Sequence, residues 1–156
     1  MRLFLPALAG LLLASSAALA EPGADLADQA RNIAEQAQHR ADYAAERPAA
    51  PAEAIDLDDP LQFDLDQFSA DAMRLSRAID EAGGPIDLRC IFRGMSGDAA
   101  SRLEALNAAE TAADQARVYR EIAALMHDAA EIAPAADGAE LPDTLGPPGT
   151  CPASHD

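Results

Sequence analysis

Hydrophobic residues recur at helical spacing through most of the chain beyond residue 20, and most clearly after Asp59-Pro60. Asp is a favourable N-cap, and Pro suits the first helical turn. Residues 83–85 read Gly-Gly-Pro, which stops a helix. A short strand over residues 61–66, where apolar and polar residues alternate, is outweighed by the longer helical run. We predict a helix over 60–82, whose apolar stripe has alternating steps of four and three: Leu61, Leu65, Phe68, Ala72, Leu75, Ile79 and Ala82.

Two or three further helices are predicted between Pro85 and Ala133. A short one begins at Pro85, buries Phe92 and its apolar neighbours, and is expected to end at Gly94 and Gly97. The next is capped by Ser96 or Asp98 and carries Leu103 and Leu106. Thr111 followed by Asp114 resembles a capping box, which predicts a fresh helix there. Residues 107–111 are alternatively a kink within one long helix. The core stripe of the last helix is Val118, Ile122, Leu125, Ala129 and Ile132.

The segments on either side of this region are less clearly patterned. Residues 24–47 have high helix propensity, but their apolar face is thin, with Leu26 and Ile33 among alanines. We expect this helix to pack weakly, and the pattern leaves open whether it docks at all. Residues 48–54, PAAPAEA, read as a stiff linker, and periodicity stops after Pro134. The fold class predicted is therefore all-α, a small irregular bundle of four to five helices.

The first twenty residues have the pattern of a secretory signal peptide. Arg2 precedes a continuous apolar stretch, and Ala18-Leu19-Ala20 forms a small-x-small cleavage site. The predicted organisation is a signal peptide over 1–20, an N-terminal helix with a Pro/Ala-rich acidic linker over 21–58, a helical domain over 59–133 and an irregular tail over 134–156. No stretch after residue 20 is predicted to span a membrane. We expect export by a cleavable signal to a bacterial periplasm.

Two cysteines in an exported chain predict one disulfide. Cys90 lies on the predicted buried helix, whereas Cys151 lies near the end of a tail rich in Pro and Gly. A bond between them would pin that tail across the bundle, and the oxidising periplasm would preserve the bond. A redox-active pair would instead show a C-x-x-C spacing, which the sequence lacks.

Charge narrows the classes of partner. From Glu21 onward, ten arginines face 27 acidic residues, which is a formal net charge of −17, and the chain has no lysine. Such a protein repels nucleic acid and anionic lipid and attracts a basic protein or a cation. The thin face over 24–47 also suits self-association. No nucleophile-and-base pair can be named, so we predict no enzyme and no cofactor. The expected function is a non-catalytic interaction module: an accessory subunit, an inhibitor or an adaptor.

A divalent-metal-binding protein is the alternative. Its candidate carboxylates lie in the acidic segment 53–66, and its other candidate is the C-terminal Cys-His-Asp group. An EF-hand loop starting at Asp56 would need Gly at its sixth position and Glu at its twelfth, where Leu61 and Gln67 stand. The proposed ligands are Asp56, Asp58, Asp59, Asp64, Asp66 and His155, with Cys151 and Asp156 beside the histidine.

Overall fold

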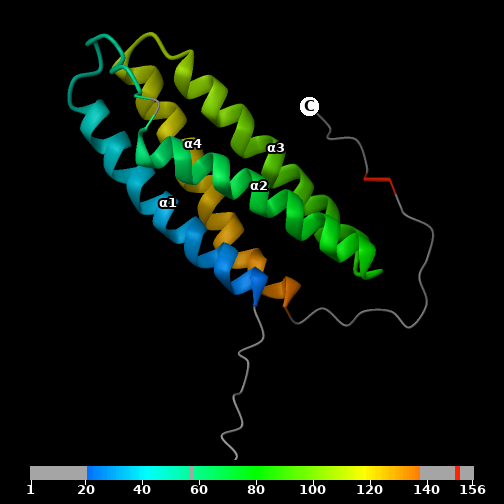
Figure 1. Cartoon of the computed structure of the whole chain (residues 1–156). Coiled ribbons are helices and arrows are strands. Elements are labelled where there is room, and N and C mark those ends of the chain that lie inside the picture. Colours follow the sequence, from blue (N-terminus) through cyan, green and yellow to red (C-terminus); the bar gives the residue numbers. More distant parts are fainter. Residues whose placement is uncertain (1–20, 57, 138–149, 152–156) are drawn as a thin grey trace, which may run out of the picture.

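Four long helices form one antiparallel bundle in the computed structural model, which describes residues 21–56, 58–137 and 150–151. Figure 1 shows that successive helices run in opposite directions. The all-α bundle is therefore confirmed. The predicted signal peptide and nearly all of the tail lie outside the described residues. Within the described ranges, no helix has the length and apolarity needed to cross a membrane. The helices are α1 (Pro22–Ala45), α2 (Pro60–Glu81), α3 (Ile86–Asn107) and α4 (Ala112–Ile132), followed by the 3₁₀ turn η1 (Ala133–Ala136).

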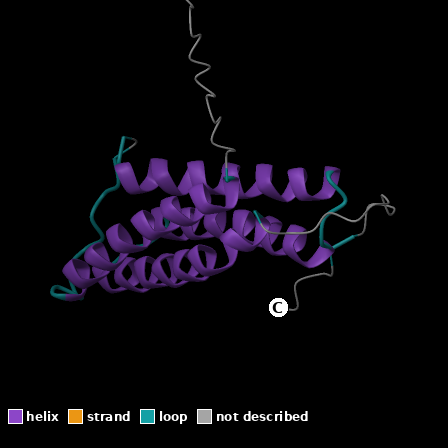
Figure 2. Cartoon of the chain, turned by 90° about the horizontal axis from the view of Figure 1, so that it is seen from below, coloured by secondary structure: helices purple, strands orange, loops and turns teal. Residues whose placement is uncertain are grey.

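The bundle consists of two pairs of helices that share one core. The most extensive contacts are those of α1 with α4 and of α2 with α3 (Figures 1 and 2). All four helices contribute to a single cluster of buried apolar side chains. The loop between α1 and α2 lies at the same end of the bundle as the turn between α3 and α4. We call this end, formed by residues 46–59 and 108–111, the loop end.

Helix α1 packs closely, contrary to the expectation of weak packing. Its buried face is a stripe of alanines at steps of three and four, flanked by Leu26 and Ile33. Alanine leaves little side chain between two helices, so their backbones approach closely and the neighbouring helix covers the whole stripe. A thin apolar face is therefore sufficient when the partner helix fits it. The alanines are Ala27, Ala30, Ala34, Ala37, Ala41 and Ala44.

Helix α2 begins and ends where its capping residues predicted. The carboxylate of Asp59 accepts hydrogen bonds from the backbone N–H groups of Leu61 and Gln62, at 2.9 and 3.2 Å. At the other end Gly83 has φ 70° and the N–H of Gly84 donates to the carbonyl of Ile79 at 2.8 Å. This bond and the positive φ make a Schellman cap, which glycine adopts without the steric cost of a Cβ.

Helix α3 continues through Gly94 and Gly97, so the helix end predicted there is wrong. Both glycines are exposed, and each costs roughly 1 kcal/mol relative to alanine inside a helix. The opposite face compensates, because it buries Phe92, Met95, Ala99 and Leu106. A hydrogen bond of 2.9 Å from Ser69 Oγ to the carbonyl of Ser96 also joins α2 to the middle of α3. Burial on one face therefore outweighs two poor helix formers on the other.

A separate helix α4 does start after Thr111, which resolves the alternative of one long helix. Thr111 Oγ1 accepts from the backbone N–H of Asp114 at 3.1 Å and donates to the carboxylate of Asp114 at 2.6 Å. This reciprocal arrangement satisfies a donor that the first turn leaves without a partner. The chain reverses direction at residues 108–111 and returns along α1.

The first and last described elements of the bundle are joined by a carboxylate. Asp137 accepts hydrogen bonds from the N–H groups of Gly23 and Ala24, at 2.8 and 2.7 Å. It thereby caps α1, whose own flanking residue Glu21 makes no side-chain cap. A Cβ at position 23 would lie 2.2 Å from the carbonyl oxygen of Ala133, so only glycine allows this close approach. The start of α1 is thus held by η1 and the residue that follows it.

Candidate functional site

A hollow of about 370 Å³ opens at the loop end and is lined by two arginines and two carboxylates. Helix α1 supplies Arg40 and Tyr43, which are three residues apart and share a helical face, and the loop just after α1 supplies Arg47. Helix α4 supplies a second tyrosine on the facing side. The hollow is lined by Arg40, Tyr43, Ala44, Arg47, Ala50, Pro51, Glu53, Asp59, Ala112, Gln115 and Tyr119.

The wall of the hollow is held in place by backbone bonds from the 46–59 loop to the start of α4. Pro51 and Thr111 form an isolated antiparallel bridge. Gln115 is 3% exposed and uses both ends of its amide on one residue. Its Oε1 accepts from the N–H of Glu53 at 2.8 Å, and its Nε2 donates to the carbonyl of Glu53 at 2.6 Å. The segment 48–54, which was expected to be a stiff linker, is therefore docked on the bundle.

The inner ion pair of the hollow joins Arg40 to Asp59. Arg40 Nη1 donates to Asp59 Oδ2 at 2.7 Å, and the two side chains are 28% and 18% exposed. Burial by itself favours the neutral form of each group, but the hydrogen bonds outweigh it. The pKa of Asp59 is lowered by Arg40 and by the N–H groups of Gln62 and Leu61. The pKa of Arg40 is raised because Asp59 and Tyr119 stabilise its charge.

This ion pair predicts a pH dependence of stability. Because the pKa of Asp59 is lower in the folded chain, its contribution is complete above the ordinary aspartate value of 3.8 and is lost as pH falls through the folded value. Asp59→Asn keeps an N-capping oxygen but removes the charge. The difference in free energy of unfolding between the two proteins should be largest near neutral pH and should shrink toward about pH 2. Urea unfolding at several pH values measures it.

The control for this prediction is Asp58→Asn at the exposed neighbouring position. Its free energy of unfolding should differ from that of the unmodified protein by only a small amount at each pH, because the charge of an exposed carboxylate contributes little to stability. A difference for Asp59→Asn that stays constant from neutral to acidic pH would show that Arg40 does not depress the pKa of Asp59.

The outer ion pair of the hollow is more accessible to solvent. Arg47 Nη2 lies 3.1 Å from Glu53 Oε1, and the two side chains are 56% and 64% exposed. The same nitrogen donates to the hydroxyl of Tyr43 at 2.6 Å, and the guanidinium lies 4.9 Å from the centre of that ring. An ion pair this exposed contributes little to stability and exchanges readily with solvent or with a ligand. The hollow thus combines one fixed pair and one exchangeable pair.

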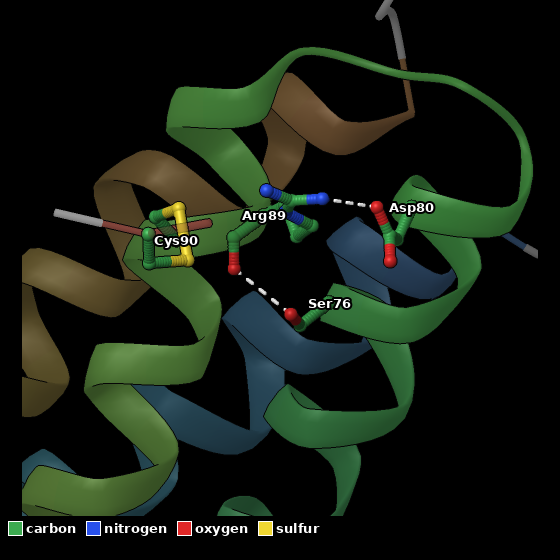
Figure 3. The surroundings of a disulfide bond; sticks show 5 residues. Ser76, Asp80, Arg89 and Cys90 are labelled. Atoms are coloured by element: carbon green, nitrogen blue, oxygen red, sulfur yellow. Dashed lines mark hydrogen bonds and ion pairs between the residues drawn. A yellow bond between two sulfur atoms is a disulfide. The ribbon is translucent and has the colours of Figure 1, made fainter. Parts of the chain in front are cut away.

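The disulfide predicted between Cys90 and Cys151 is present (Figure 3). It joins residues 61 apart in sequence, so it attaches the end of the tail to the first part of α3. Both residues are only partly buried. The rest of the tail, apart from residues 134–137, 150 and 151, lies outside the described residues. The predicted covalent bond between Cys90 and the tail is therefore confirmed.

A buried arginine lies beside the disulfide, and the sequence interpretation did not identify it. The side chain of Arg89 is 4% exposed and forms an ion pair with Asp80 of α2, while its carbonyl accepts from Ser76 Oγ at 2.8 Å (Figure 3). A signal was available, because Arg89 begins a stripe on α3 at alternating steps of three and four. That stripe is Arg89, Phe92, Ser96, Ala99, Leu103 and Leu106.

The structure does not gather the proposed metal ligands. Among the described residues, no three His, Cys, Asp or Glu side chains lie close enough to hold an ion. Asp59 faces Arg40, and Asp64 accepts a hydrogen bond from Gln36 Nε2 at 2.9 Å. Asp56, Asp58 and Asp66 are exposed. The other candidate, His155, lies outside the described residues with Asp156, and Cys151 belongs to the disulfide.

The sequence interpretation also missed the hollow. The only local signal was the spacing of Arg40 and Tyr43 on one face of α1, because the other lining residues come from the loop after α1, from α4 and from the N-cap of α2. Comparisons with known proteins add no constraint: no protein-family model matches the chain, and no curated protein or solved structure shows significant similarity to it.

Proposed function

We propose that the chain is a non-catalytic interaction module of the periplasm, exported by a cleavable signal, and that it binds a basic protein at its loop end. The observation that carries the proposal is an exposed aromatic residue beside exchangeable charges: Tyr43 is 48% exposed and stacks with Arg47 at the mouth of the hollow. Tyrosine and arginine are enriched among the residues that contribute most to protein interfaces.

Charge around this position supports a partner of opposite sign. Exposed carboxylates lie at the loop end, on the loop between α1 and α2 and on the α3–α4 turn, and the whole chain has a formal net charge of −16. Complementary charge at an interface accelerates encounter and disfavours acidic competitors. The exposed acidic residues at the loop end are Glu46, Glu53, Asp56, Asp58 and Glu110.

The test is a pull-down from a periplasmic extract with three immobilised proteins: the unmodified chain, Tyr43→Ala and Ile86→Ala. Ile86 is a matched control, because it is 49% exposed and begins α3 at the opposite end of the bundle. We expect a basic protein that is retained at low salt, released as salt rises, lost with Tyr43→Ala and kept with Ile86→Ala. The captured protein is then purified and its affinity for each variant is measured.

Two outcomes would contradict the proposal. Retention of the same partner by Tyr43→Ala with unchanged affinity would place the interface elsewhere. Retention that depends on neither salt nor Tyr43 would also remove it. If the chain associates only with itself, sedimentation of the purified protein reports a dimer, and self-association replaces the basic partner.

Metal binding is the competing proposal from another class. Calorimetry with calcium, zinc and copper separates it from the interaction role, because a divalent site in the acidic segment or at the C-terminus would release heat on titration. We expect no heat above that of dilution. Heat that Asp56→Asn abolishes would support a site in the 53–66 segment, whereas heat that His155→Ala abolishes would support the C-terminal group.

A further inference from the structure

The hollow holds more arginine donors than its own carboxylates use. A guanidinium has five N–H groups. Arg40 engages Asp59 through Nη1 and also interacts with Tyr119, and Arg47 engages Glu53 and the Tyr43 hydroxyl through Nη2. Each arginine therefore binds its partner and retains further N–H groups for an added acceptor. Two arginines lining one hollow are notable in a chain with 27 acidic residues and only 11 basic ones.

Part of the lining of the hollow is apolar. Ala44 and Ala112 belong to a small buried cluster, and Ala50 packs against it. Pro51 and the ring of Tyr43 add further apolar surface to the lining. A volume of about 370 Å³ lies at the small end of ligand pockets. The shape suits a compact ligand with an apolar body and one charged group.

Glu53 is placed so that a ligand can replace its side chain without opening the loop. Its backbone is bound on both sides by the buried amide of Gln115, at 2.8 and 2.6 Å. Its carboxylate, by contrast, is 64% exposed and makes one ion pair, with Arg47. Rotation of this side chain into solvent frees an arginine donor and leaves the wall of the hollow intact.

We propose that the hollow is a binding site for a small organic carboxylate, whose charged group binds between Arg40 and Arg47 in place of Glu53 and whose apolar body rests on Ala44, Ala50 and Ala112. The proposal does not rest on the proposed protein partner, although both involve this hollow, and purified protein tests it without that partner. Charge-assisted hydrogen bonds from arginine are the interactions that favour a carboxylate over a neutral molecule of the same shape.

The test titrates purified protein with benzoate and, as a neutral probe of similar shape, benzamide. Amide and arginine side-chain NMR shifts report where each probe binds and with what dissociation constant. We expect benzoate to bind with a Kd of about 1 mM or tighter and to shift resonances of residues lining the hollow. Benzamide should bind at least about tenfold more weakly.

Three variants make the proposal specific. Arg47→Gln should weaken benzoate binding about tenfold or more, because it removes a charged donor. Glu53→Gln should tighten binding about threefold or more, because it removes the competing carboxylate. Arg77→Gln is the control, since Arg77 is exposed on α2 and does not line the hollow, and the affinity should change less than about twofold.

The proposal is overturned by equal affinity for benzoate and benzamide, by equal weakening in Arg47→Gln and Arg77→Gln, or by a Glu53→Gln affinity no greater than that of the unmodified chain. Circular dichroism of each variant confirms that the helices are retained. Failure here leaves the protein-partner proposal standing, because that proposal is tested through Tyr43 in an extract.

Discussion

Replacing Cys90 and Cys151 together by serine is expected to lower the free energy of unfolding by about 3–4 kcal/mol. The bond joins residues 61 apart in sequence. In the chain-entropy model, closing a loop of that length lowers the entropy of the unfolded chain by the equivalent of about 4 kcal/mol, and measured values are often smaller. The loss is large for this protein, since typical domains have only about 5–15 kcal/mol of stability. Urea unfolding with linear extrapolation measures it.

Reduction of the unmodified protein is the matched control for the double serine variant. Both should lose similar stability, because both remove the same constraint and leave the helices otherwise unchanged. The oxidised protein should resist alkylation until it is reduced. A loss below about 1 kcal/mol in both cases would show that the tail adds no effective constraint to the unfolded chain.

Asp80→Ala is expected to cost about 3 kcal/mol. Asp80 forms the ion pair with Arg89, whose side chain is 4% exposed. Removal of the carboxylate takes away the counter-charge of Asp80, which helps to offset the desolvation of the buried guanidinium. The side chain of Asp80 is itself 36% exposed, so water reaches this edge and the cost falls at the lower end of the range for buried pairs.

Asp66→Ala is the control on the same helix, at an exposed position, and should change stability by less than about 0.5 kcal/mol. Asp80→Asn keeps an oxygen acceptor without the charge and should fall between the two alanine variants. A cost for Asp80→Ala no larger than that for Asp66→Ala would mean that the Arg89 charge does not depend on Asp80 in the folded protein.

The helices that sequence predicts well are those whose limits are set by local chemistry. Asp59-Pro60 starts α2 and Gly83 ends it, while Thr111 and Asp114 start α4. Each of these caps satisfies backbone groups within a few residues, so the information lies within a few positions of the sequence. The disulfide could also be predicted from the sequence, because a chain with two cysteines allows a single pairing.

The features that sequence reasoning misjudged all depend on a distant segment. Gly94 and Gly97 favour a helix end locally, but α3 continues because its other face is buried against α2 and the core. The alanines of α1 look like a weak apolar face until α4 covers them. In α3, burial between helices outweighs a local preference of about 1 kcal/mol at each glycine. In α1, the close fit of a second helix buries a face whose side chains are small.

The candidate site also depends on contacts between segments that are distant in sequence. Arg40 and Tyr43 share a face of α1 by their spacing, yet the hollow also needs the loop after α1, which supplies Arg47 and Glu53 and docks on α4 through Gln115. Likewise, Arg89 lies in the apolar stripe of α3 by its spacing, but its pairing with Asp80 requires α2 and α3 to pack together. The sequence by itself determined the helical class, the capped helix ends and the disulfide. The first two follow from local bonding, and the third follows because two cysteines allow one pairing. The tertiary structure decided which faces are buried and which charges meet, because burial is a property of segments that come together only in the folded chain.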